Sequence, residues 1–275
     1  MILSGVRTHA GQFPTTTFFL LAFLLTWAVW VPRAVAPEGW ATTVGTFWTW
    51  MPAIAAVLTA ALVGGGALRD LGARLTRWRV GWQWYVLVLV GPAAFWALVW
   101  AATAAAGWSG ELGRPMMLEQ GVASAAVLVP VLALTDGLGE ETGWRGFALP
   151  RMLDRYGPVL ASVLLGLLWA LWHLPLFFTE GLQLAGRSPW VLLLELPAVA
   201  VVYTWVFQRT GGSALLAILL HAGTNFTTLS ASVAGATVRV TVLVLLATWL
   251  LAAVVIGAWQ RKRTPRRAAS ARDLT

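Results

Sequence analysis

The chain contains no cysteine and little charge, and each of these shortages excludes a class of protein. Without cysteine there can be no disulfide framework, no thiolate metal site and no cysteine nucleophile. Only 11% of the 275 residues are charged, whereas a soluble domain needs about 25% to cover its surface. The hydrophobic content is 59% and the mean hydropathy is +0.74. Most of this chain must therefore have lipid as its solvent.

The residues that are abundant agree with a membrane setting. Eighteen tryptophans suit the headgroup interface, where an indole ring has one apolar and one hydrated side. The net charge of +8 would indicate nucleic acid in a soluble protein. Here the arginines flank apolar runs and gather at the C-terminus, so membrane lipids are the expected partner and nucleic acid is not.

Apolar runs long enough to cross a bilayer of about 30 Å recur along the whole chain. They predict an all-α polytopic membrane protein, multi-pass in the cell membrane, with about eight transmembrane helices. The windows are Thr15–Val31, Thr43–Val63, Trp84–Ala105, Val122–Leu138, Pro158–Phe178, Trp190–Phe207, Ser213–Leu229 and Val238–Trp259. Arginine is more frequent in the segments on the side of both termini, which predicts an N-in/C-in orientation. Residues 1–259 are expected to form one transmembrane domain, and residues 260–275 a basic cytoplasmic tail.

Several ionisable residues lie where an apolar bilayer makes them costly. Hydropathy alone assigns the segment from Gly139 to Phe147, with Glu140, Glu141 and Arg145, to a loop after the fourth span. His173 and His221 are both surrounded by apolar residues inside later spans. If the fourth helix continues through the glutamates to about Arg155, all these groups reach a similar depth and become partners. We therefore expect the helix to continue.

Helical spacing organises the polar groups. Glu141 precedes Arg145 by four residues, the favourable order for an ion pair on one helix face. Glu140 is rotated by about 100° from Glu141 and so faces a different direction. His221 and Asn225 are also four residues apart, which places an imidazole and a carboxamide on one face.

Each polar residue also has a structural explanation. Glu141 and Arg145 could form an ion pair that only stabilises the fold. His173 could bond a carbonyl freed by a nearby proline, which transmembrane helices tolerate, and Asn225 could join two helices. Asp136 and Glu195 are left as packing or lumen residues. Packing explains the whole group poorly, however, and we interpret it as a functional site.

The motifs resemble those of a known family. Glu140-Glu141-x-x-x-Arg145, then Trp169-x-x-x-His173, then His221-x-x-x-Asn225 are similar in order and spacing to the motifs of the CAAX-protease and bacteriocin-processing (CPBP, or Abi) intramembrane peptidases. The resemblance covers about residues 120–230, which would be the catalytic core. The aromatic residue of the second motif is usually Phe in that family and is Trp169 here.

The resemblance implies an intramembrane endopeptidase that acts on a peptide or protein, with CAAX-like prenylated tails or bacteriocin-type peptides as substrate classes. Glu140 and His173 would activate a water molecule, and His221 and Asn225 would stabilise the oxyanion. Glu141 and Arg145 would hold the geometry. A carboxylate in an apolar cavity is a stronger base than in water, which agrees with this chemistry.

The sequence leaves two questions open. The family is commonly labelled metalloprotease, and Glu140, His173 and His221 could bind Zn²⁺ with an open fourth position. The chain lacks the HExxH spacing, so we favour a water activated without metal. Two other functions compete with proteolysis: a non-catalytic scaffold or immunity protein of the same fold, and a proton-coupled transporter. No internal repeat supports a transporter.

Overall fold

The computed structural model describes residues 2–36, 47–108, 111, 123–182, 184–230 and 237–263, and the regular structure in this part of the chain is helical. In chain order the helices are α1 (Ile2–Gln12), α2 (Pro14–Val35), η2 (Phe47–Trp50), α3 (Met51–Val63), α4 (Ala67–Leu75), α5 (Trp82–Ala105), α7 (Ala123–Leu132), η4 (Ala133–Gly137), α8 (Leu138–Glu141), η5 (Thr142–Ala148), α9 (Leu149–Trp172), η6 (Leu174–Phe178), α10 (Trp190–Arg209), α11 (Ala214–Ser230) and α12 (Val238–Arg263).

The predicted continuation of the fourth helix through the glutamates is confirmed. Helical backbone runs without a break from α7 into α9, but it is not a uniform α-helix. η4 and η5 are π-helical turns on either side of the short α8, which holds both glutamates. Helix α9 then bends at Gly157, which has a φ of 70° that costs glycine little. Pro158 follows and cannot donate the hydrogen bond that would keep the helix straight.

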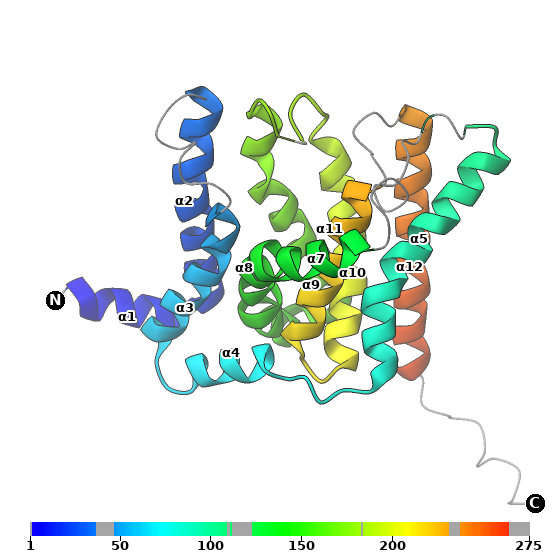
Figure 1. The fold of residues 1–275 in the computed structure, drawn as a ribbon. Helices are drawn as coiled ribbons and strands as arrows, with labels where there is room; N and C mark the ends of the chain where they lie inside the picture. The colour runs from blue at the N-terminus through cyan, green and yellow to red at the C-terminus, as the bar shows by residue number, and fades with distance from the viewer. Residues whose placement is uncertain are drawn as a thin grey trace, which may run out of the picture.

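The helices form a central group with a pair on each side. Figure 1 shows α2 and α3 on the left, α7 to α11 in the centre, and α5 and α12 on the right. In this view α7 runs across the page, whereas α2 and α12 stand upright. Helix α9 packs extensively on α10, and α5 and α12 contact α11 and α10 respectively. The central group therefore lies inside the bundle.

The structure supports several membrane crossings. Five helical stretches are long and apolar enough to span a bilayer, and the shorter apolar stretches Trp48–Val63 and Ala214–Thr228 coincide with the second and seventh windows. The fourth and fifth windows belong to one helical stretch, Ala123–Phe178. Of the predicted tail, residues 260–263 continue α12, and residues 264–275 lie outside the described part.

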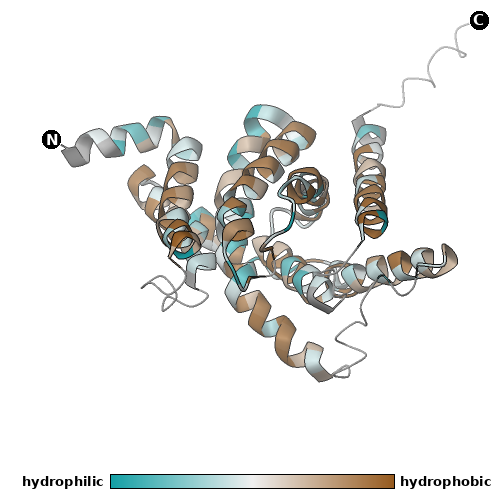
Figure 2. Ribbon diagram, turned by 90° about the horizontal axis from the view of Figure 1, so that it is seen from above, coloured by the Kyte–Doolittle hydropathy of each residue, from teal (hydrophilic) through white to brown (hydrophobic). Residues whose placement is uncertain are grey.

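The outer faces of the bundle are apolar. Leu24 of α2, Leu98 of α5 and Leu250 of α12 are exposed at the protein surface. Seen from above, apolar residues recur along the helices, the outer ones included (Figure 2). A soluble protein would expose such a surface to water at high cost. The chain is a multi-pass membrane protein with a lipid-facing exterior.

Small residues let the helices of the central group approach closely. A Cβ added at Gly166 of α9 would lie 2.4 Å from the Cα of Pro197 in α10. A Cβ at Gly139 of α8 would lie 2.3 Å from the carbonyl oxygen of Thr49, which precedes α3. Such distances are too short for any side chain, so these contacts require glycine. The segment with the glutamates is consequently held in place by close backbone packing on several neighbours.

Candidate active site

Glu140 is buried and is held by two tryptophans. Its Oε2 accepts hydrogen bonds from the indole Nε1 of Trp169 at 2.6 Å and of Trp144 at 3.3 Å. Trp144 follows on the next turn of the same helix, whereas Trp169 comes from α9. Within the described residues, Oε1 has no protein partner. One oxygen of this carboxylate is therefore fixed, and the other is free for a small molecule.

Glu141 faces a different set of partners, as the rotation along the helix predicts. Its Oε1 accepts from Nη1 of Arg145 at 2.8 Å and from Nδ1 of His221 at 2.9 Å. Glu141 and Arg145 are fully buried, and His221 is nearly so. The predicted ion pair between Glu141 and Arg145 is present, and it also binds a histidine from a helix eighty residues further along the chain.

The guanidinium of Arg145 lies between two aromatic rings. It stands 4.6 Å from the ring centre of Trp169 and 4.5 Å from that of Tyr203 in α10. Cation–π contacts of this kind are strongest where water is excluded. The hydroxyl of Tyr203 in turn donates to Oγ1 of Thr224 in α11 at 3.2 Å. Arg145 thus connects α9, α10 and α11 around the acidic segment.

His173 lies at the end of α9, next to the same tryptophan that binds Glu140. Its Nδ1 is 2.8 Å from the carbonyl oxygen of Trp169. A carbonyl can only accept, so Nδ1 carries the hydrogen and Nε2 is unprotonated in the neutral ring. No direct hydrogen bond joins Glu140 and His173 in the part of the chain described here; Trp169 connects them, through its indole on one side and its carbonyl on the other.

Asn225 contacts a residue outside the predicted set. Its Nδ2 donates to Oδ2 of Asp136 in η4 at 3.1 Å. His221 and Asn225, one turn apart on α11, therefore both face the acidic segment, at Glu141 and Asp136 respectively. The structure brings together all six predicted residues, either directly or through Trp169 and Asp136.

Sequence reasoning left Asp136 as a packing or lumen residue and did not name Trp144 or Tyr203. Asp136 and Trp144 stand four residues before and after Glu140, so the spacing could have pointed to both. Nothing in the sequence singles out Tyr203, because its position depends on how α10 packs against α9.

Glu140, His173 and His221 are the candidate zinc ligands of the sequence analysis. Among the described residues, no three His, Asp or Glu side chains are grouped so that they could hold a metal ion. Oε2 of Glu140 and Nδ1 of both histidines have hydrogen-bond partners, so a metal would bind through Oε1 and the two Nε2 atoms. Zinc at these residues stays a prediction, and the mechanism proposed for this site uses a water activated without metal.

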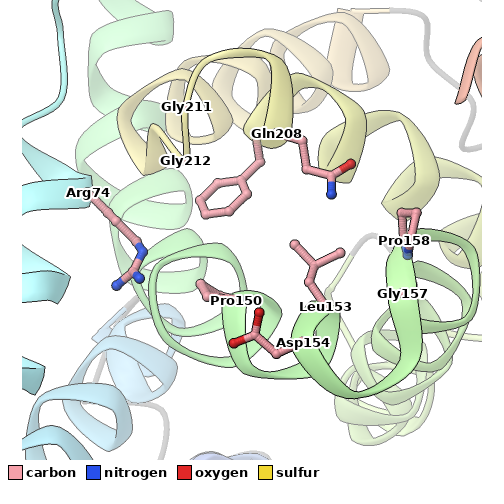
Figure 3. Close-up of a pocket in the computed structure, with 10 residues that line it drawn as sticks. Arg74, Pro150, Leu153, Asp154, Gly157, Pro158, Gln208, Gly211 and Gly212 are labelled. Atoms are coloured by element: carbon pink, nitrogen blue, oxygen red, sulfur yellow. The ribbon is translucent and has the colours of Figure 1, made fainter. Parts of the chain in front are cut away.

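A pocket of about 490 Å³ lies elsewhere, between α4, the bend of α9 and the turn after α10. Figure 3 shows Arg74, Asp154 and Gln208 around it, near Gly157 and Gly211. None of the motif residues lines this pocket. The candidate site is recognised by its chemistry, and this pocket is separate from it.

Comparison with known proteins agrees with the motif cluster. Residues 122–227 match the family model described as Type II CAAX prenyl endopeptidase Rce1-like. This segment is similar to the Rce1-like family. It contains every residue of the cluster, whereas the neighbouring helices α2, α3 and α5 lie outside it. The Rce1-like segment is thus the same central group that buries the glutamates.

A curated relative of the Rce1-like segment is CAAX prenyl protease 2 of Methanococcus maripaludis. The two chains are 36% identical over 101 residues, which cover 34% of this chain and 37% of the archaeal protein. The likeness therefore concerns about a third of either molecule, and the remaining helices are not part of it.

Proposed function

We propose that the chain is an intramembrane endopeptidase in which Glu140 and His173 activate a water molecule. The observation that supports this most is the cluster at the centre of an apolar bundle, in which Glu140, Glu141 and His221 are buried and Asn225 is half-buried. Burying two acids together with their partners costs stability. A fold without chemistry to perform would gain from apolar residues at these positions.

The first step is proton removal from water. Oε1 of Glu140 is the free oxygen, while its Oε2 is held by Trp169 and Trp144. Nε2 of His173 is the unprotonated nitrogen, because Nδ1 faces the Trp169 carbonyl. A water between them gives up a proton to Oε1 of Glu140, and its oxygen attacks the peptide carbonyl carbon. The same proton then goes to the departing amine as the C–N bond breaks.

His221 and Asn225 would stabilise the negative charge on the carbonyl oxygen. Nδ1 of His221 faces the Glu141 carboxylate, so this nitrogen carries a hydrogen. Nε2 can donate to an oxyanion only when the ring is doubly protonated. Glu141, placed between His221 and Arg145, favours that imidazolium. Glu141, which Arg145 holds in place, therefore orients His221. Donors fixed in a dry site stabilise developing charge strongly.

The relative's name suggests the substrate class. That protein is called a CAAX prenyl protease, and a membrane-embedded site suits a substrate whose tail carries a lipid. We propose a peptide or protein substrate with a CAAX-like prenylated end, cleaved at the cell membrane.

The decisive experiment compares the wild type with Glu140→Gln in proteoliposomes that contain a quenched fluorogenic peptide with a prenylated CAAX-like tail. Glutamine keeps the acceptor for Trp169 but cannot take a proton, so kcat should fall by at least about 10³-fold, within the range that loss of a catalytic base produces. The melting temperature should change little. Equal cleavage by both folded proteins would exclude the proposed role of Glu140.

The same preparation separates the competing functions. A scaffold would leave the peptide intact in both samples, and its cellular phenotype would survive Glu140→Gln. A transporter would show proton flux that depends on Glu140 without peptide cleavage. A chelator added to the wild type tests zinc: loss of cleavage that returns with Zn²⁺ would contradict the metal-independent mechanism.

A further inference from the structure

Asp136 is an acid inside the membrane region to which the proposed mechanism gives no role. It lies in η4, four residues before Glu140, and its Oδ2 accepts from Nδ2 of Asn225 at 3.1 Å. It is also close enough to Glu140 and His221 to interact with both electrostatically. We propose that Asp136 is a positioning residue, which fixes the carboxamide of Asn225 so that its second N–H points at the substrate carbonyl. This inference rests on the proposed function.

The carboxamide of Asn225 has two ends with opposite chemistry. It can present either its oxygen or its NH₂ group in a given direction, since the two ends have nearly the same shape. A carboxylate only accepts, so Asp136 binds the NH₂ end and rejects the oxygen. Nδ2 has two hydrogens, and Asp136 uses one of them. The other hydrogen then has a fixed direction, which an oxyanion site requires.

The backbone around Asp136 holds it against α11. The next residue, Gly137, packs so closely that an added Cβ would lie 2.9 Å from the carbonyl oxygen of Ile218 in α11. Asp136 itself stands in the π-helical turn η4, whose extra residue per turn sets the direction of its side chain. One crossing of α11 thus aligns two pairs at once: Asp136 with Asn225, and Glu141 with His221.

The alternative is that Asp136 merely joins two helices. A structural contact and a positioning contact differ in what they change. If Asp136 acts through Asn225, its removal lowers kcat, leaves KM nearly unchanged, and has no effect once Asn225 is absent. If it only supports the fold, its removal lowers the melting temperature and acts equally in both backgrounds.

The test is a double-mutant cycle in proteoliposomes with the prenylated fluorogenic peptide. Asp136→Ala should lower kcat by about 10- to 100-fold, less than the about 10²- to 10³-fold expected for Asn225→Ala, because loss of an oxyanion donor costs that much. The double variant should be no slower than Asn225→Ala alone. Asp136→Asn keeps an acceptor but no longer selects the NH₂ end, so it should recover part of the lost rate.

Glu195→Gln is the matched control, because Glu195 is another carboxyl of the membrane region, in α10 and outside the cluster. The kcat of this variant should equal that of the wild type. The inference would be overturned if the double variant lost kcat by the product of the losses in Asp136→Ala and Asn225→Ala. A changed KM with unchanged kcat in Asp136→Ala would overturn it too. If Asp136→Ala does not fold, the cycle is run with Asp136→Asn. If wild type and Glu140→Gln are equally inactive on the peptide, the proposed function fails and the inference fails with it. The coupling between Asp136 and Asn225 is therefore measured on a peptide whose cleavage depends on Glu140.

Discussion

The central helices of this protein are buried by other protein segments to a greater extent than the outer helices. In the stretch Ala123–Phe178 and in α10, the most apolar windows are 44% and 50% buried inside the protein, against 17% in α5 and 28% in α12. The buried acids and their arginine belong to the first group. The most apolar helix, α12, is one of the least covered, since lipid replaces protein as its surroundings.

The difference shows that burial by protein, rather than hydropathy, tells where charge can lie in a membrane. The charged groups of the cluster have partners that only a neighbouring helix or turn can provide, such as His221 for Glu141. An outer helix has lipid on one side and no such partner to offer. The Rce1-like match, residues 122–227, contains all of these acids.

The largest effect on stability should come from breaking the buried ion pair. Arg145→Met leaves Glu141 fully buried with His221 as its remaining partner. We expect the free energy of unfolding to fall by about 3–5 kcal/mol, because an uncompensated charge stays in the interior. Denaturant unfolding in detergent micelles would measure it.

The control for Arg145→Met lies in the outer region. Arg239 of α12 pairs with Glu111, and its side chain is largely exposed, so Arg239→Met should cost less than about 1 kcal/mol. Similar losses for the two arginines would contradict the contrast between central and outer helices.

A smaller loss of stability should distinguish alanine substitutions at two glycines of the bundle, Gly166 and Gly257. Gly166→Ala forces a Cβ against the backbone of Pro197 in α10 and should destabilise the protein by about 1–3 kcal/mol, as overpacking does. Gly257→Ala in α12 meets no atom within 4 Å. It should leave stability unchanged or raise it by up to about 1 kcal/mol. Thermal unfolding of both variants checks the pair, and equal losses would show that α9 and α10 can move apart.

The smallest effect concerns a single hydrogen bond. Trp169→Phe keeps a ring against Arg145 but removes the N–H that binds Glu140 at 2.6 Å. We expect kcat on the prenylated peptide to fall about tenfold, or about 1.4 kcal/mol. Trp205→Phe in α10 is the matched control, because its buried indole N–H has no partner among the described residues. Unchanged kcat in Trp169→Phe would mean that Trp144 alone holds Glu140.

The sequence predicts the contacts that depend on helix spacing alone. The Glu141–Arg145 pair and the shared face of His221 and Asn225 follow from a separation of four residues, and the structure contains both. The helical continuation through the glutamates was also predictable, because buried charges need partners at the same depth. The functional roles of these residues remain predictions until the variants are measured.

Contacts between distant segments could not be predicted in the same way. Trp169 reaches Glu140 across 29 residues, and Asp136 reaches Asn225 across 89. Such contacts depend on how each helix is rotated about its axis, which hydropathy does not determine when both lipid and protein interior are apolar. The motif resemblance pointed to the correct segments without revealing which atoms meet.

The two π-helical turns, η4 and η5, limit how far the number of residues between Leu132 and Leu149 can change. Each holds one residue more per turn than an α-helix, and together they enclose the two glutamates. Deleting Gly137 from η4 would rotate Glu140 and Glu141 by about 100° relative to Asp136. We therefore expect that an insertion or deletion between Leu132 and Leu149 would separate the acids from their partners.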